Sequence, residues 1–182
     1  MEDFKNKYLK KLKRKAREIS GEFEQTELIY LEAKREFVEA IIEYCDKNNK
    51  KSPLEFEKKK EKPDRSELFQ EEEVKDVYRK IAINTHPDKT IKLKEKDREI
   101  TCDLFNNAAQ AKENESLLEL SKVASKLKIN LNNLTYSQLE SLEAELQEKE
   151  GEIKKMREDI CWAWHFMNKN QKKNIIYKIC ER

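Results

Sequence analysis

The residues best suited to recognition chemistry lie between Glu73 and Thr90, in the stretch EVKDVYRKIAINTHPDKT. Pro87 has no amide hydrogen, and it disfavours helical geometry at the residue before it. We therefore expect a helix that ends near Thr85 and is followed by a tight, exposed turn. In that turn Asp88 presents a carboxylate, which suits a charge-assisted hydrogen bond to an arginine of a partner.

The helix that precedes this turn has two dissimilar faces at 3.6 residues per turn. The opposite side from the core is mainly basic: it carries Arg79 and Lys80 with Asp76 and Ile83, and Lys75 lies on its flank. We interpret it as a docking surface that includes Ile83. A solvated helix face is the alternative, because runs of charge usually mean only that. The side assigned to the core carries Val74, Tyr78, Ile81, Ala82 and Thr85.

The same stretch resembles the second helix and following loop of the J-domain family, the DnaJ-like co-chaperones. In that family a helix of the form E-[IV]-K-x-x-Y-R-K-[LI]-A leads into H-P-D-K. His86 follows Tyr78 by eight residues, as the family spacing requires. The His-Pro-Asp tripeptide, the helix before it and the spacing between them all match the family, so the resemblance is more specific than the tripeptide alone. The matching helix residues are Glu73, Val74, Lys75, Tyr78, Arg79, Lys80, Ile81 and Ala82.

The resemblance extends from about Glu67 to Ile129. In DREITCDLFNNAAQA, three residues stand where the family packs its third helix against the second, namely Phe105, Ala108 and Ala109. The next stretch, ENESLLELSKVASKLKI, is similar to a less common subtype in which another helix replaces the acidic end. The family's first helix is absent just upstream. We expect REFVEAIIEYC, the end of a long first helix, to take its place across the linker; partial substitution by Leu68 and Phe69 is the alternative.

The resemblance implies a regulatory role and no catalysis. J-domains dock on a DnaK-type heat-shock ATPase through the basic second helix, and the His-Pro-Asp loop triggers ATP hydrolysis. The alternative is a coiled-coil scaffold or adaptor whose J-like head is only structural. In either case an unidentified client or assembly would bind through the arms on either side. Carried onto this sequence, the partner-binding residues are His86, Pro87, Asp88, Lys89, Lys75, Arg79, Lys80 and Ile83.

Composition predicts an all-α protein, and the resemblance together with the flanking seams implies a J-domain head inserted between two long coiled-coil-forming helices. The 182 residues are 42% charged and 37% hydrophobic, with only two Gly and three Pro, which excludes an all-β fold. We expect a long N-terminal helix within 1–45, a charged linker at 46–66 and the head at 67–130. A C-terminal coiled-coil helix and a short terminal helix occupy 136–182.

Both predicted arms carry apolar seams spaced by three and four residues. Gly21 weakens the first arm and allows a bend there. Antiparallel pairing of the arms within one chain is the simplest arrangement, and parallel pairing in a homodimer is the competing one. The first seam comprises Leu12, Ala16, Ile19, Phe23, Thr26, Tyr30, Ala33, Phe37, Ala40 and Tyr44; the second comprises Leu139, Leu142, Leu146, Lys149, Ile153, Met156, Ile160, Ala163 and Met167.

Further helices are expected at about 67–85, 93–112 and 171–180, and one more within ENESLLELSKVASKLKI. In that last stretch the predicted buried face carries Leu117, Leu120, Val123, Ala124 and Leu127. Thr135 or Ser137 is expected to cap the second arm. Glu140 follows Ser137 by three residues, the spacing of a capping box.

Charge argues against a general nucleic-acid binder. The 39 Lys and Arg residues nearly balance 37 Asp and Glu, for a net charge of +2, whereas such proteins usually carry a clear basic surplus. The run Lys10, Lys11, Lys13, Arg14, Lys15 and Arg17 is interpreted as the solvent-facing side of the first helix. Nucleic-acid binding or a nuclear address remains the alternative interpretation of that run.

Catalytic, metal and cofactor sites are not expected. Cys45, Cys102, Cys161 and Cys180 form no C-x-x-C pair and are typical of reduced cysteines in an intracellular, cytoplasmic protein. In CWAWHF, His165 and Cys161 are too few for a metal site, and packing is the interpretation. The sequence has no Gly-rich loop, no evident nucleophile and base, no secretory signal and no apolar run near ~20 residues. We therefore expect a soluble protein with no membrane partner.

Overall fold

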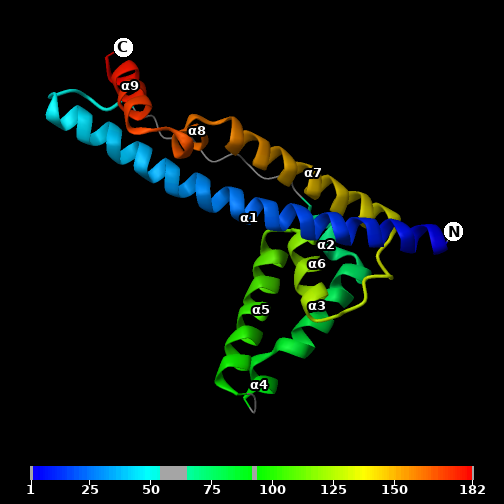
Figure 1. The fold of residues 1–182 in the computed structure, drawn as a ribbon. Helices are drawn as coiled ribbons and strands as arrows, with labels where there is room; N and C mark the ends of the chain where they lie inside the picture. Colours follow the sequence, from blue (N-terminus) through cyan, green and yellow to red (C-terminus); the bar gives the residue numbers. More distant parts are fainter. Residues whose placement is uncertain (1, 54–64, 92–93, 182) are drawn as a thin grey trace. The chain divides into compact units, whose positions relative to one another are not determined.

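The computed structural model describes residues 2–53, 65–91 and 94–181, and these residues form α-helices and connecting turns without a strand (Figure 1). The expected all-α class is confirmed. The chain divides into two compact units, which are described separately. The first unit comprises Met1–Ile19 and Lys62–Glu148, and the second comprises Ser20–Glu61 and Lys149–Arg182.

The long N-terminal helix is present as α1 (Glu2–Lys47). Its helical assignment continues through Gly21 without interruption. The predicted seam is the covered side of the helix, since none of its ten residues is exposed. Leu12, Ala16 and Ile19 are buried in the first unit, while Ala33 and Phe37 are buried in the second.

The second arm begins with α7 (Tyr136–Glu158). Within the second unit this arm runs parallel to α1, so the expected antiparallel arrangement is wrong there. Within the second unit, Arg157 donates a hydrogen bond to Thr26 at 3.2 Å, and Tyr44 donates one to Glu181 at 2.6 Å. Residue numbers of the contacting side chains therefore rise in the same direction along both segments, as parallel pairing requires. This pairing occurs within one chain.

The predicted linker, 46–66, falls largely on residues 54–64, which lie outside the described residues.

The expected single helix over 67–85 is wrong, because two helices occupy that stretch: α2 (Ser66–Gln70) and α3 (Glu72–Thr85). The break falls at Glu71, whose backbone is extended with φ −69° and ψ 143°. The Glu71 carboxylate accepts a hydrogen bond from Nε2 of Gln138 at 2.5 Å. The break thus holds this carboxylate against a distant segment of the same unit.

The remaining helices of the first unit are α4 (Pro87–Thr90), α5 (Glu95–Glu113) and α6 (Leu117–Lys126). The helix predicted at 93–112 corresponds to α5, with residues 92–93 outside the described residues. The predicted apolar face of α6 is confirmed except at Leu127, which is only half-buried. The largest fully buried side chains of the unit are Leu9, Leu12, Ile81, Leu117, Leu118, Leu120, Leu131, Leu134, Leu139, Leu142 and Leu146.

The segment REFVEAIIEYC does not pack in the first unit, so the role expected for it beside the predicted second helix is wrong. Phe37 and Ile41 of this segment lie instead in the core of the second unit with Trp164 and Ile176. Its apolar side is occupied by these partners. Upstream of α3, the buried aromatic residue is Phe69 of α2, which is 7% exposed.

The cap of α7 is formed by Thr135, the first of the two predicted candidates. Thr135 Oγ1 accepts a hydrogen bond from the Gln138 amide at 3.3 Å, and Gln138 Oε1 accepts one from the Thr135 amide at 2.8 Å. This reciprocal pair is a capping box. The alternative box of Ser137 and Glu140 is wrong, because α7 already begins at Tyr136.

The second seam is confirmed as far as Met156, since none of its residues up to there is exposed, and it fails after Asp159. There the chain breaks into α8 (Ile160–Phe166), followed by α9 (Lys169–Cys180). Asp159 is extended at ψ 149°, and its carboxylate accepts a hydrogen bond from the Cys161 amide at 2.7 Å. The break shifts the helical register. Ile160 and Ala163 are therefore exposed, whereas Cys161 and Trp164 are buried.

The core of the second unit joins the end of α1 to α8 and α9. The rings of Phe37 and Trp164 meet edge to face, with centroids 5.1 Å apart. The predicted packing role of CWAWHF is thus confirmed at Trp164. Within the described residues, no helix has the length and apolarity to cross a membrane. The core residues are Ala33, Phe37, Ile41, Cys45, Cys161, Trp164 and Ile176.

The packing of α9 against α1 can be tested through two thiols. Cys45 and Cys180 have sulfur atoms 3.8 Å apart. We expect dibromobimane, which fluoresces when it links two thiols, to join them. Burial, and then contact with Cys45, raise the pKa of the Cys180 thiol to about 11, so labelling should accelerate as pH rises. Cys180→Ser should abolish the linked peptide and Cys102→Ser should retain it; the opposite pattern would contradict this packing.

A buried carboxylate joins α7 to the start of α6 within the first unit. Glu145 is 4% exposed and accepts hydrogen bonds from the Ser116 hydroxyl at 2.7 Å and from the amides of Leu117 at 2.9 Å and Leu118 at 3.1 Å. The first amides of a helix have no partner inside that helix, so Glu145 satisfies them. Burial raises the pKa of Glu145, while these hydrogen bonds act in the opposite direction.

Glu145→Ala is therefore expected to destabilise the protein by roughly 2–4 kcal/mol, because two buried amides lose their acceptor. Chemical denaturation followed by circular dichroism measures the loss. Glu140→Ala is the matched control, since Glu140 is an exposed glutamate of the same helix and should change stability by under about 0.5 kcal/mol. Equal effects of the two substitutions would refute the capping role.

Candidate functional site

The predicted end of the basic helix is confirmed at Thr85. The Thr85 side chain is buried and donates a hydrogen bond to the carbonyl of Ile81 at 2.8 Å. The His86 amide still donates to the carbonyl of Ala82 at 2.8 Å, but the His86 backbone then leaves helical geometry at ψ 132°. The last turn of α3 is therefore satisfied before the chain changes direction.

The tight turn expected after His86 is a single helical turn, α4. His86 caps this turn: its Nδ1 accepts a hydrogen bond from the Asp88 amide at 3.3 Å. Thr90, at the end of α4, is buried at 2% exposure. The turn is anchored at its far end, while the side chains of Asp88 and Lys89 face solvent.

The Asp88 carboxylate is the most accessible acceptor of the turn, with its side chain 82% exposed. Its nearest partner among the described residues is Nδ1 of His86, 3.4 Å from Oδ2. An imidazole that accepts a hydrogen bond at Nδ1 is unprotonated there, so the capping role and an ion pair with Asp88 exclude each other. The capped turn therefore leaves the carboxylate open to an outside donor.

An aromatic contact from α5 positions the imidazole of His86. The ring of Phe105 meets it edge to face, with centroids 5.8 Å apart and an angle of 87° between planes. Such pairs contribute about 0.5–1.5 kcal/mol beyond the area that they bury. Sequence analysis placed Phe105 between the second and third helices of the head. It did not anticipate the contact with His86, which depends on how α3 and α5 pack.

The outer side of α3 carries the four other predicted residues: Lys75, Arg79, Lys80 and Ile83. Ile83 is 58% exposed and Arg79 is exposed, while Lys75 and Lys80 are half-buried. Two of the three cations already have carboxylate partners in the same helix. Arg79 pairs with Glu72, and Lys80 pairs with Asp76 at 2.6 Å.

These intrahelical ion pairs are weak and exchangeable. The side chains of Arg79 and Glu72 are 58% and 70% exposed, and those of Lys80 and Asp76 are 45% and 38% exposed. Exposed ion pairs contribute about 0–1 kcal/mol, so a partner carboxylate can replace Glu72 or Asp76 at little cost. Lys75 forms no ion pair with a described residue. The surface is basic, but its charge is partly compensated.

A cavity of about 330 Å³ adjoins this basic side within the first unit. Its walls include Lys75, Tyr78 and Arg79 of α3, Phe69 of α2 and Lys112 of α5. The ammonium group of Lys112 lies 4.9 Å from the centroid of the Tyr78 ring. Lys112 thus adds a cation beside the predicted surface. The sequence carried no signal for it, because it comes from another helix.

The N-terminal basic run presents a separate cationic stretch on α1. Lys10, Lys11, Arg14 and Arg17 have exposed side chains, as expected for a solvent-facing side. Lys13 is half-buried, and its burial, together with nearby Arg17, lowers its pKa. Among the described residues, no group of three His, Cys, Asp or Glu side chains is placed to hold a metal ion.

Comparison with models of protein families, with curated proteins and with solved structures gives no significant match for this chain. The geometry of the candidate site therefore carries the functional argument. The structure brings His86, Pro87, Asp88 and Lys89 into one exposed turn at the end of α3. It places the other predicted residues along the outer side of the same helix.

Proposed function

We propose that this protein is a co-chaperone of the J-domain type. The outer side of α3 would dock on a DnaK-type heat-shock ATPase, and the turn His86-Pro87-Asp88 would stimulate hydrolysis of ATP by that partner. The chain itself would cleave no bond. Its arms would bind a client or an assembly. The proposal rests on the sequence resemblance together with the geometry of this turn.

The observation that carries the proposal is an exposed carboxylate, held in a capped turn at the end of a basic helix. Asp88 is 82% exposed, and the hydrogen bond between its amide and His86 holds the turn in shape. An arginine of the partner could therefore reach the carboxylate without any rearrangement of the turn. Charge-assisted hydrogen bonds of this kind are about twice as strong as neutral ones.

The second candidate is a scaffold or adaptor whose head has no effect on an ATPase. It is favoured by the pairing of Arg79 with Glu72 and of Lys80 with Asp76, which reduces the cationic character of α3. In that case binding of a partner by the arms would not depend on Asp88. The two functions therefore differ in the effect of changing one side chain.

Asp88→Asn is expected to reduce stimulation of a purified DnaK-type ATPase at least tenfold, because a hydrogen bond to a charged group contributes about 1.5–3 kcal/mol. His86→Gln should also reduce it, because the imidazole that accepts the Asp88 amide is lost. Steady-state ATP hydrolysis under identical conditions is the measurement. Asp103→Asn is the matched control, since Asp103 is exposed on α5 of the same unit and should leave stimulation unchanged. Wild-type protein that stimulates none of a panel of such ATPases, or variants as active as wild type, would favour the scaffold.

Removing the α3 carboxylates that pair with Arg79 and Lys80 should strengthen docking of this helix on the ATPase. Glu72→Gln and Asp76→Asn release Arg79 and Lys80, so each is expected to lower by severalfold the concentration of protein that gives half-maximal stimulation. Exposed charges act through the surrounding solution, so the gain should shrink as salt is added. Glu99→Gln, an exposed substitution on α5 with the same charge change, is the control. If it matched the α3 variants, net charge and not this helix side would govern docking.

A further inference from the structure

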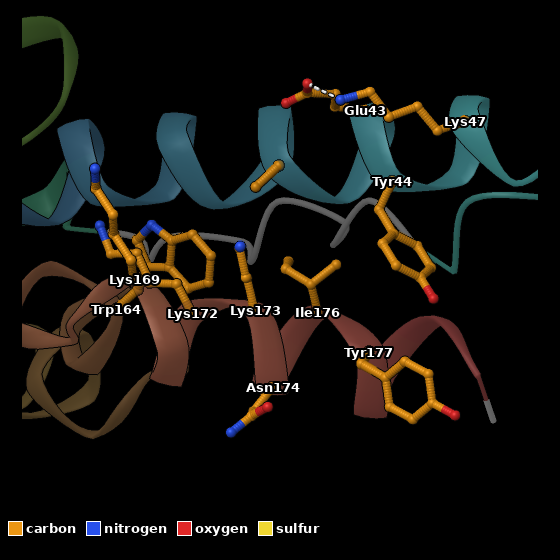
Figure 2. A pocket seen from close by; sticks show the side chains of 11 residues that line it. Glu43, Tyr44, Lys47, Trp164, Lys169, Lys172, Lys173, Asn174, Ile176 and Tyr177 are labelled. Carbon is orange, nitrogen blue, oxygen red and sulfur yellow. Dashed lines mark hydrogen bonds and ion pairs between the residues drawn. The ribbon is translucent and has the colours of Figure 1, made fainter.

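A groove in the second unit lies between the end of α1 and α9 (Figure 2). Its volume is about 720 Å³, within the range of about 300–1,000 Å³ typical of ligand sites. Tyr44 points into it from α1, Ile176 and Lys173 point from α9 toward α1, and Trp164 of α8 closes one end (Figure 2). The interior is therefore apolar and aromatic.

Lysines dominate the charge around this groove. Four line it, against one carboxylate, Glu43. Lys47 pairs with Glu43 at 2.5 Å, and Lys172 pairs with Glu36 at 3.2 Å. The other two, Lys169 and Lys173, are exposed and form no ion pair with any described residue. The groove therefore offers two uncompensated cations beside an apolar floor, which is complementary to an anionic, partly apolar occupant.

An unsatisfied hydrogen-bond donor at the end of the groove also favours an occupant that carries acceptor oxygens. Trp164 is 3% exposed, and its indole N–H has no acceptor among the described residues. A buried donor without an acceptor costs about 1–3 kcal/mol. The ammonium group of Lys172 lies over the face of the Trp164 ring, 4.9 Å from its centroid, whereas the N–H donates in the plane of the ring. An oxygen-bearing occupant would satisfy the donor.

The arrangement favours a peptide over a nucleic acid. Single-stranded nucleic acids stack their bases on accessible aromatic faces. Trp164 offers no such platform, because Phe37 contacts it edge to face and Lys172 lies over its ring. A peptide with carboxylates and aliphatic or aromatic side chains satisfies both the apolar interior and the free cations. Helices with one apolar and one charged side bind to grooves of this kind.

We propose that this groove binds an acidic peptide segment of a partner protein. Aliphatic or aromatic side chains of the segment lie between Tyr44 and Ile176, and its carboxylates pair with Lys169 and Lys173. This function goes beyond stimulation of an ATPase and does not depend on it. It gives the C-terminal part of the chain a binding role of its own.

The test begins with the full chain and a displayed library of random 12-residue peptides. Enriched peptides should combine Asp or Glu with Leu, Phe or Trp. Fluorescence anisotropy of the strongest labelled peptide then gives its Kd. The double variant Lys169→Glu and Lys173→Glu should weaken binding at least tenfold. The matched control is Lys155→Glu with Lys178→Glu, which changes two exposed lysines of the same unit by the same charge and should retain binding.

The indole N–H of Trp164 gives a readout of the position of the peptide. In a two-dimensional ¹⁵N–¹H spectrum, its resonance should move downfield when the acidic peptide binds, while that of Trp162 should move less. The spectrum of the Lys169 and Lys173 double variant should match the wild-type spectrum elsewhere, which shows that the fold is retained. Stimulation of the ATPase by this variant should equal that of wild type, so failure of either proposal can be recognised separately.

Several outcomes would overturn the peptide proposal. These are absence of enrichment, enrichment of peptides without acidic residues, or equal binding by the double variant and its control. A single-stranded oligonucleotide that displaces the peptide and binds more tightly would assign the groove to nucleic acid. Self-association that disappears in the Lys169 and Lys173 double variant, measured by sedimentation equilibrium, would assign it to a second copy of the chain.

Discussion

The geometry of the candidate site depends on the residue that ends α3. A helix that continued through position 87 would need an amide hydrogen that proline lacks, so the chain leaves helical geometry at His86. Hydrogen bonds between neighbouring residues then stabilise the end of the helix and the turn. Thr85 bonds back to Ile81, and His86 accepts the Asp88 amide. These local hydrogen bonds hold the turn from within the chain, and the Asp88 side chain remains exposed to solvent.

Local pattern was sufficient to predict most helices and their buried sides. The seam of α1 and the end of α3 follow from residue spacing and from one proline, and both depend on nearby residues alone. The breaks at Glu71 and Asp159 could not be predicted in this way. Glu71 is held by Gln138, far away in the chain, and Asp159 competes as a cap within a stretch whose helical spacing continues unbroken. The register after Asp159 was consequently wrong.

The direction of the arms and the surroundings of the site are also outside the reach of local pattern. A heptad seam is compatible with parallel or antiparallel partners, so residue spacing does not fix the direction of pairing. The contact of Phe105 with His86 and the approach of Lys112 to Tyr78 arise from helix packing. By contrast, the pairing of Asp76 with Lys80 has the i,i+4 spacing that favours ion pairs, so the sequence did contain a signal for the reduced charge of α3.

This charge compensation indicates where recognition at α3 would originate. A partner carboxylate that pairs with Arg79 or Lys80 displaces Glu72 or Asp76, so the number of ion pairs on the helix does not rise. Exposed pairs differ little in free energy, and such an exchange gives orientation more than affinity. Asp88 and Ile83 are different, because an outside donor or an apolar surface gives each a contact that the free protein lacks. In the proposed docking, discrimination among partners would therefore come from the turn and from Ile83, while the cations would steer the approach.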